Sequence, residues 1–434
     1  MCNWAYGLLK TDRFSGAVDL RHFHKRASLS TMSISHVWSH GQGGRPEKPH
    51  GLNRCLHERY VAIAKSHGCD SYWMDTPCIP EDHQLRAEAI AYINQVFHTS
   101  AVTLVCDRDL MTYDIGTLTL EKKESILATI LVCDWNVRAW TFLEAFRGKS
   151  HIHLLFQNDR TMSFLSILED VCSSGRVDLA VLFLNATHLL PPPRYGDSTY
   201  PSKLHTDHVN VGFVSVEEAS MLLSHRQASR EGDDVVIWSL LVDENAYHSA
   251  EKFWLSRCDI TRAPADNINT GFLISSAPRI KKVPGLGWAP ATPTCNFTSD
   301  NYFLSGDGHR TRLARFNAKG LTGSFAVNIF RPETGPDSEV YQRAINSFLK
   351  KQEPLKKLSF RWIALLQPLL DLETEHPTAY RYRGNGNAVE HIVFGVCVSN
   401  SRTTHTAKWT WKGVYQWDYR HSLPEFWEAE LTLV

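Results

Sequence analysis

The stretch AVTLVCD, residues 101–107, decides the fold. It is a short, largely apolar run that ends in an aspartate, as a buried β-strand does. A helical segment at residues 81–100 precedes it, and a long helix that ends at Gly148 follows it. A strand placed between helices of this length is typical of an α/β domain.

Three further strands are expected around this one. They are MSISHVW at residues 32–38, SYWMD at 71–75 and HIHLLFQ at 151–157. Residues 53–67 have helical spacing, and Gly68 is the expected residue just beyond the end of that helix. Connections of this kind are right-handed crossovers, so the pattern predicts a mostly parallel, three-layer sheet.

A proline-rich stretch follows this region and predicts a domain boundary. Three successive prolines interrupt LLPPPRYGDSTYPS at residues 189–202. We therefore expect an α/β domain at residues 1–190, a linker at 191–204 and an α+β domain at 205–434. Within the last, helices are expected at 216–229, 246–257 and 340–349, and DDVVIWSLLV at 233–242 fits a buried strand or a short helix.

Composition excludes several classes of protein. The chain has 434 residues, 43% of them hydrophobic and 21% charged, and its formal net charge is zero. It lacks the roughly 20-residue apolar run that spans a bilayer. Its ten cysteines form no CxxC pair and no secretory signal is recognisable, so we expect a cytoplasmic protein without a disulfide framework or zinc site. No metal, no cofactor and no particular oligomeric state are predicted.

The carboxyl ends of the expected strands carry polar groups. In open α/β sheets, ligands bind beyond these ends. The candidate substrate-binding residues that the strands bring to this rim are Trp38, Asp75, Cys78, Asp107 and Asp109. The loop after the first strand adds Gly41, Gly43 and Gly44, a weak candidate for binding a phosphate because its spacing fits no established phosphate-loop motif.

The segment DWNVRAWTFLEAFRG, residues 134–148, carries the candidate catalytic groups. If it is one helix, Trp140 and Glu144 lie one above the other, and Arg138 sits half a turn before Trp140. Burial beside an indole raises the pKa of a carboxyl, whereas a neighbouring arginine lowers it. Glu144 is therefore a candidate for acid/base or electrostatic chemistry, with Arg138 and Trp140 beside it.

Local basic runs are candidates for contacting phosphates. Lys281 and Lys282 form one, and Lys350 and Lys351 form another. Such runs are most often solvated faces, but they are also where a chain of zero net charge would bind an RNA backbone.

The first 190 residues resemble the heterokaryon-incompatibility (HET) domain of filamentous fungi. Three blocks carry the resemblance, and they occur in the order of that family: SISHVWS, YWMDTPCIPEDHQLRAEAI and RAWTFLEAF. GWAPATP, at residues 287–293, is similar to a segment of other chains that contain this domain. His36 stands where the family has tyrosine and Ser39 where it has glycine, which makes His36 a further candidate for substrate binding.

The resemblance implies a TIR-like, flavodoxin-like fold and a role for the glutamate. In TIR domains a Trp-x-x-x-Glu helix supplies the glutamate of NAD cleavage, and Trp140 and Glu144 have that spacing. One hypothesis is thus a heterokaryon-incompatibility or cell-death effector that cleaves NAD, which would be its substrate, or that assembles a signalling complex.

The other hypotheses are a biosynthetic enzyme and a non-catalytic scaffold. In size and outline the chain resembles fungal arginine-containing cyclodipeptide synthases, which join amino acids delivered on aminoacyl-tRNA, and such a synthase is the leading hypothesis. An acidic rim of Asp75, Asp107, Asp109 and Glu144 suits a small cationic substrate. The DDxxE motif associated with those enzymes is missing, because Asp233 and Asp234 are followed by VVI.

Overall fold

The chain folds into two compact units in a computed structural model. The first comprises residues 1–214 and 225–246, and the second comprises residues 215–224 and 247–434. Residues 225–246, which the sequence analysis placed in the second domain, thus cluster with the first. The predicted linker, 191–204, lies outside the described residues. Those are 9–10, 27–42, 54–80, 82–149, 151–176, 178–179, 182–183, 189, 214–224, 226–242, 245–258, 267–293, 311–332, 339–352, 360–369, 393–404, 407–418 and 420–434.

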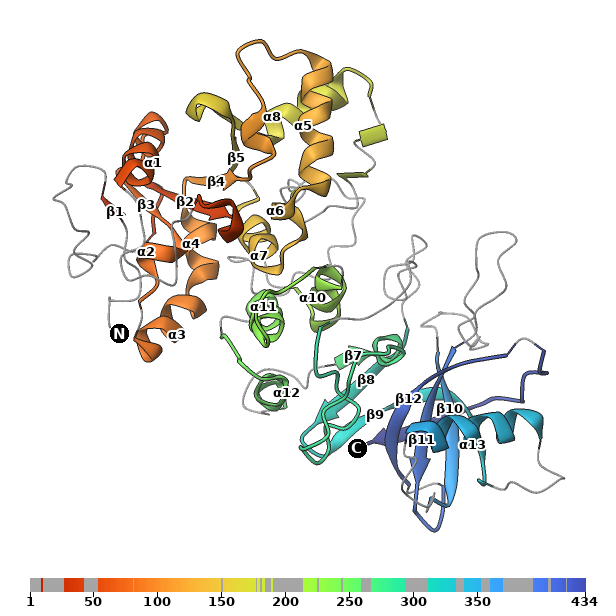
Figure 1. The fold of residues 1–434 in the computed structure, drawn as a ribbon. Helices are drawn as coiled ribbons and strands as arrows, with labels where there is room; N and C mark the ends of the chain where they lie inside the picture. The colour runs from red at the N-terminus through yellow and green to blue at the C-terminus, as the bar shows by residue number, and fades with distance from the viewer. Residues whose placement is uncertain are drawn as a thin grey trace, which may run out of the picture. The chain divides into compact units, whose positions relative to one another are not determined.

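The first unit is built on a six-stranded sheet in the order β1-β3-β2-β4-β5-β6 (Figure 1). The four predicted strands are its centre, and all three pairings among them are parallel, as expected. Short antiparallel strands close the two edges. The strands are β1 (Leu9–Lys10), β2 (Thr31–His36), β3 (Ser71–Trp73), β4 (Val102–Cys106), β5 (Ile152–Leu155) and β6 (Thr161–Ser163).

Helices cover both faces of this sheet. Tyr72 and Trp73 are adjacent on β3, so their side chains point to opposite faces. Tyr72 meets Tyr60 of α1 (Arg54–Ser66), with 5.9 Å between ring centroids, and Trp73 meets Phe97 of α4 (Ile93–Thr99) at 5.5 Å. Figure 1 shows α1 and α4 on opposite sides of the strands. The mixed α/β architecture with a parallel-rich sheet is therefore as predicted.

Two predicted helices are broken in the structure. The segment expected as one helix at 81–100 consists of α3 (His83–Ala91) and α4, separated at Tyr92; Asp82 caps α3 by accepting from two backbone N–H groups. The helix after β4 is divided into α5 (Leu120–Val132), α6 (Asp134–Val137) and α7 (Ala139–Gly148). Short helical turns complete the unit: η2 (Trp38–His40), α2 (Asp75–Cys78), η3 (Leu110–Thr112) and η4 (Gln157–Asp159).

The prediction of a single helix over residues 134–148 is thus wrong at Arg138. Its backbone is extended, with φ −84° and ψ 144°, and forms a parallel bridge with Gln227. The Ala139 N–H donates to the Gln227 carbonyl at 3.0 Å, and the Gln227 N–H donates to the Val137 carbonyl at 3.1 Å. Pairing with a segment almost 90 residues further along the chain overrides local helix propensity here.

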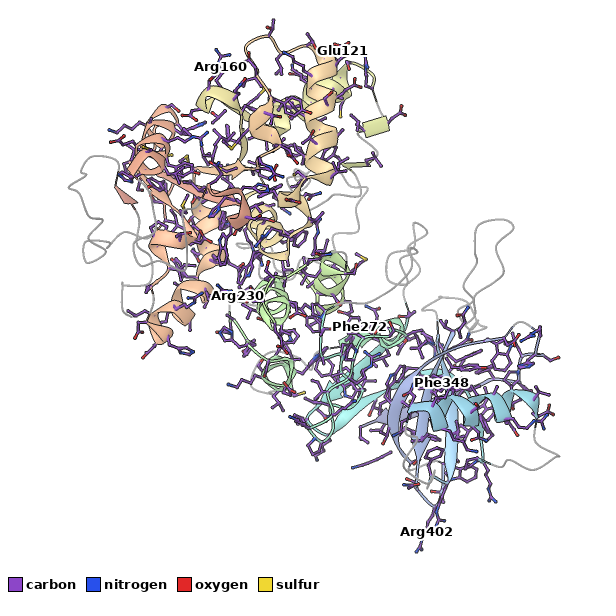
Figure 2. The ribbon with its side chains drawn as sticks, in the orientation of Figure 1. Glu121, Arg160, Arg230, Phe272, Phe348 and Arg402 are labelled. Atoms are coloured by element: carbon purple, nitrogen blue, oxygen red, sulfur yellow. The ribbon has the colours of Figure 1, made fainter. Side chains whose placement is uncertain are left out.

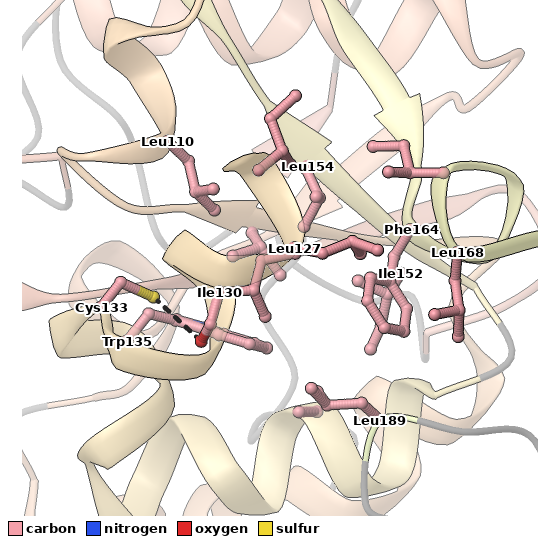
Figure 3. Packing of buried hydrophobic residues seen from close by; sticks show 14 of the residues in the cluster. Leu110, Leu127, Ile130, Cys133, Trp135, Ile152, Leu154, Phe164, Leu168 and Leu189 are labelled. Carbon is pink, nitrogen blue, oxygen red and sulfur yellow. Dashed lines mark hydrogen bonds between the residues drawn. The ribbon is translucent and has the colours of Figure 1, made fainter. Parts of the chain in front are cut away.

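A continuous apolar core joins β4 and β5 to the helices that follow them. Val105, Ile152 and Leu154 pack with Leu127 and Ile130 of α5, and α8 (Phe164–Ser173) adds Phe164 and Ile167 (Figure 3). Trp135 closes one side of this cluster. Helix α7 approaches the sheet closely, since a Cβ added at Gly148 would collide with the Thr103 side chain.

Residues 225–246 of the first unit contain α11 (Asp233–Val242). The run DDVVIWSLLV, for which a buried strand or a short helix was expected, is therefore a helix. The buried Arg147 of α7 donates from Nη2 to the carbonyls of Leu240 and Leu241 at 2.8 and 3.2 Å. Asn94 of α4 donates to the Leu240 carbonyl at 2.7 Å. These bonds satisfy carbonyls in the last turn of α11 and place a positive charge there, which favours the helix dipole.

The second unit is a β-sheet closed on itself, with helices beside it. Strand β10 pairs with both β11 and β9, so β9 to β13 form a five-stranded ring, which β8 and β7 extend. Its strands are β7 (Asn267–Asn269), β8 (Leu313–Asn317), β9 (Gly320–Phe330), β10 (Trp362–Pro368), β11 (Val393–Ser399), β12 (Lys408–Gln416) and β13 (Trp427–Leu433). Its helices are α10 (Val216–Leu223), α12 (Ala250–Arg257), η7 (Thr270–Leu273) and α13 (Val340–Gln352).

An aromatic cluster holds the GWAPATP segment in the second unit. The Trp288 ring lies 5.1 Å from that of Trp254 and 5.3 Å from that of Phe316, measured between centroids. Trp254 Nε1 donates to the Pro290 carbonyl at 2.9 Å, and the Ile280 N–H donates to the Ala289 carbonyl at 3.0 Å. This segment therefore stabilises the second unit.

Candidate functional site

The candidate site lies in the first unit, where β2 and β3 end. His36 is the last residue of β2, and Asp75 opens α2 two residues after β3. Glu144 reaches this edge from the middle of α7, which packs against β2 and β4. We call Ser35, His36, Asp75, Trp135 and Glu144 the Glu144 site.

His36 and Asp75 form a buried pair. His36 Nε2 lies 2.7 Å from Asp75 Oδ1, and Trp38 Nε1 donates to Asp75 Oδ2. Thr76 also donates to Oδ1, from its backbone N–H at 2.6 Å. A carboxylate only accepts, so the His36 ring carries its proton on Nε2. Asp75 therefore has both oxygens engaged by protein groups, and the predicted pairing with a substrate guanidinium is not what the structure favours.

Ser35 connects Glu144 to the core beneath it. The indole N–H of Trp135 donates to Ser35 Oγ at 2.7 Å, and the Ser35 hydroxyl donates to Glu144 Oε2. Because the indole occupies a lone pair of Oγ, the hydroxyl hydrogen is directed at the carboxylate. Glu144 retains 8% of its surface, and among the described residues no group hydrogen-bonds its Oε1. One carboxylate oxygen is thus held and the other is free to meet a ligand.

Burial raises the pKa of the Glu144 carboxyl to about 7. The Ser35 hydrogen bond acts in the opposite direction, the charge of Asp75 raises the pKa further, and the charges of His36 and Arg138 lower it. A carboxyl with a pKa near 7 exchanges its proton readily at neutral pH, as a general base or acid must. The sequence-based expectation of opposing effects from burial and Arg138 is confirmed.

In the neighbouring pair, the pKa values of His36 and Asp75 are shifted in opposite directions. Burial acts to lower the pKa of His36, but the charge of Asp75, the hydrogen bond to it and the charge of Glu144 outweigh burial, and the pKa is raised. Burial acts to raise the pKa of Asp75, but His36 and the Trp38 hydrogen bond outweigh it, and the pKa is lowered. Both directions favour an imidazolium beside a carboxylate, which places a positive charge next to Glu144.

Two predicted rim residues do not join this site. Asp107 is 0% exposed, and its oxygens accept the backbone N–H groups of Asp109 at 2.8 Å and Trp135 at 3.1 Å. It therefore ties the end of β4 to α6 and is not available to a substrate. The Asp109 carboxyl is half-exposed and faces Arg108, with 3.8 Å between the charged atoms. The predicted four-carboxylate rim is thus not assembled.

Trp140 and Cys78 also have structural partners. Trp140 Nε1 donates to Asp233 Oδ2 at 2.7 Å, which fastens α7 to the start of α11. Trp140 therefore positions the helix that carries Glu144. Cys78 is buried, and burial raises the pKa of its thiol to about 12. A thiol that stays protonated at neutral pH is a poor nucleophile.

The predicted phosphate-binding residues belong to both units. Gly41 ends η2 with a positive φ of 71°, so its role is to turn the chain. Gly43 and Gly44 lie outside the described residues. Lys281 and Lys282 are exposed, as are Lys350 and Lys351 in the last turn of α13, and all four belong to the second unit.

Sequence reasoning missed four residues that shape the site. Ser35 and Trp135 support Glu144 from below, and Gln227 and Arg230 reach the first unit from beyond the proline-rich stretch. The alternation of Ser33 and Ser35 with Met32 and Ile34 was a usable signal, because small hydroxyl residues on one buried face of a strand need partners there. No local signal marks Gln227 or Arg230.

No three His, Cys, Asp or Glu side chains of the described residues gather in a way that would hold a metal ion. In the same part of the chain, no helix has the length and apolarity needed to cross a membrane. The chain matches no protein-family model, and comparison with curated proteins and with solved structures gives no match.

Proposed function

We propose that the first unit is an enzyme that cleaves the N-glycosidic bond of a nicotinamide dinucleotide, with Glu144 as its catalytic residue. The observation that carries the proposal is a buried, partly accessible glutamate with a pKa raised to about 7, fixed at the carboxyl end of β2. The HET resemblance, and through it the TIR-like Trp-x-x-x-Glu helix, points in the same direction.

The topology supports a ligand at this place. The four parallel strands lie in the order β3-β2-β4-β5. If they are renumbered 1 to 4 along the chain, this order is 2-1-3-4, which is that of flavodoxin-like sheets. With helices on both faces, a three-layer TIR-like fold is the arrangement we propose. In such sheets ligands bind beyond the carboxyl ends at the point where the strand order reverses, here between β2 and β4. Ser35 and His36 end one of those two strands.

The chemistry asks for a carboxylate. When the bond between ribose C1′ and the nicotinamide nitrogen breaks, its electron pair neutralises the pyridinium ring, and positive charge develops on the ribose. A carboxylate placed there stabilises that charge. Water then adds to C1′ and releases one proton, which Glu144 accepts and passes to solvent. The positive charge of His36 helps to keep Glu144 ionised before the reaction.

The synthase hypothesis receives less support. It requires a cation-recognising acidic rim, and Asp75 and Asp107 are both engaged by protein groups. Exposed lysines in the second unit remain candidates for RNA phosphates. A cell-death effector that depletes NAD is the biological role that the proposed chemistry fits.

The test is NAD consumption by the purified full-length chain. Glu144→Gln removes the charge with little change in shape, and we expect it to lower the turnover rate by about 10²-fold or more. The matched control is Glu121→Gln, at an exposed position of α5 (Figure 2), which should keep full activity. Thermal unfolding of each variant checks that the fold is intact.

Two results would overturn the proposal. One is that the wild-type chain does not consume NAD; the other is that a folded Glu144→Gln variant consumes it normally. Ribonuclease treatment separates the alternatives, because NAD cleavage requires no RNA. Formation of a cyclodipeptide that ribonuclease abolishes would establish the synthase instead.

A further inference from the structure

Arg230 is an exposed cation held against the Glu144 site. Its guanidinium carbon lies 5.1 Å from the centroid of the Trp38 ring, in a cation–π contact. The same indole donates to Asp75, which pairs with His36. Arg230 is therefore connected to His36 through two residues, Trp38 and Asp75.

Arg230 has no acidic partner within 4 Å among the described residues. Four other arginines of the first unit do face carboxylates within that distance: Arg59 faces Asp159, Arg108 faces Asp109, Arg160 faces Asp114 and Arg176 faces Glu124. A guanidinium that stacks by its face keeps its edge N–H groups free. Those donors match the oxygens of a phosphate in a bidentate arrangement.

The segment that carries Arg230 is fastened on both sides. Three residues before it, Gln227 bridges to the backbone on either side of Arg138. Three residues after it, Asp233 accepts from Trp140 of α7. Arg226 adds a bond from Nη1 to Asn136 Oδ1 at 3.1 Å. Both anchors are on or beside the helix that carries Glu144, so the position of Arg230 is tied to that of the glutamate.

We infer that Arg230, stacked on Trp38, binds the diphosphate group of a dinucleotide substrate whose ribose meets Glu144. The inference rests on the proposed function and extends it, because it specifies how the substrate is recognised. In such a substrate the diphosphate is one ribose away from the cleaved glycosidic bond, and its negative charge is the group that the guanidinium on Trp38 would recognise.

Direct binding tests this inference separately from turnover. Titration calorimetry of the full chain uses ADP-ribose, which has the diphosphate, and nicotinamide riboside, which does not. Arg230→Ala should weaken ADP-ribose binding about tenfold or more and leave nicotinamide riboside binding unchanged. Arg230→Lys should lie between, since it keeps the charge and loses the bidentate geometry. Arg160→Ala, at a half-exposed position of the same unit (Figure 2), is the control and should bind as wild type does.

Trp38→Phe separates the two contacts of Trp38, because it keeps an aromatic face for Arg230 and removes the hydrogen bond to Asp75. We expect it to retain most of the ADP-ribose affinity. Equal binding of ADP-ribose by wild type and Arg230→Ala, or no binding by wild type, overturns the inference. NAD turnover, measured on the same preparations, decides the proposed function on its own.

Discussion

Two regions of the molecule bury different kinds of groups, one in the first unit around Glu144 and the other in the second unit around Trp288. In the first, Ser35, Asp107 and Glu144 are buried polar side chains held by hydrogen bonds. In the second, Trp254, Trp288 and Phe316 pack ring against ring. Buried carboxyls reduce stability unless they are well paired, whereas buried aromatic rings increase it. Around Glu144 some stability is thus given up to hold reactive groups in place, whereas the aromatic cluster around Trp288 only adds to stability.

The aromatic side of this comparison is tested by Trp288→Ala, for which we expect the largest effect. Trp288 is 0% exposed, and its removal should lower the free energy of unfolding by about 3–5 kcal/mol. Calorimetric unfolding of the full chain measures the change. Trp427→Ala is the control, because Trp427 is 47% exposed and its loss should cost less than about 0.5 kcal/mol. Similar losses for the two variants would contradict the assignment of Trp288 to the core.

The polar side is tested by the pH dependence of stability. The folded pKa of Glu144, about 7, lies above the ordinary 4.5, so the folded chain binds more protons between these values. Stability from this group is therefore lost as pH rises through that window. Glu144→Gln lacks this loss. Between pH 4.5 and pH 8, the free energy of unfolding of the variant should therefore rise relative to that of wild type by up to about 3 kcal/mol.

Denaturant unfolding at several pH values measures this difference. Glu169→Gln, at an exposed position of α8, is the matched control and should follow wild type at every pH. If the difference between Glu144→Gln and wild type stays constant with pH, the Glu144 carboxyl is not strained by burial, and the contrast between the two units weakens.

A smaller effect is expected at the link between α7 and α11. Trp140→Phe keeps the ring and removes the hydrogen bond to Asp233, which should lower the free energy of unfolding by about 1 kcal/mol. NAD turnover should fall only modestly, since Trp140 positions the helix and does not meet the substrate. A loss of activity as large as that of Glu144→Gln, with the fold retained, would show that Trp140 acts in the reaction itself.

Much of the first unit follows from local patterns. Short apolar runs between helical segments predict β2 to β5 and their parallel pairing, and Gly68 does adopt the positive φ expected beyond α1. Glu144 was identified from helical spacing together with the resemblance to the Trp-x-x-x-Glu helix. It lies buried at the carboxyl edge of the sheet, because an apolar face of α7 packs there.

The errors concern contacts between distant parts of the chain. The helix breaks at Arg138 because Gln227 pairs with its neighbours, and Asp107 is removed from the rim because the Trp135 backbone binds it. Neither partner can be inferred from the residues nearby. The closure of β9 to β13 by β10 is also a long-range pairing, which alternation of side chains predicts only as separate strands.

The chain leaves the first unit, enters the second and then returns to the first, so the first unit is synthesised in two separate parts. A ribosome releases Glu144 well before Gln227, Arg230 and Asp233, and residues 215–224 of the second unit emerge in between. Domains usually fold from the amino terminus as they emerge. Here the nascent first unit lacks α11 and the partners of Arg138 and Trp140 until residues 227–242 are released. A chain that is terminated before Gln227 therefore carries Glu144 without the segment that fastens α7.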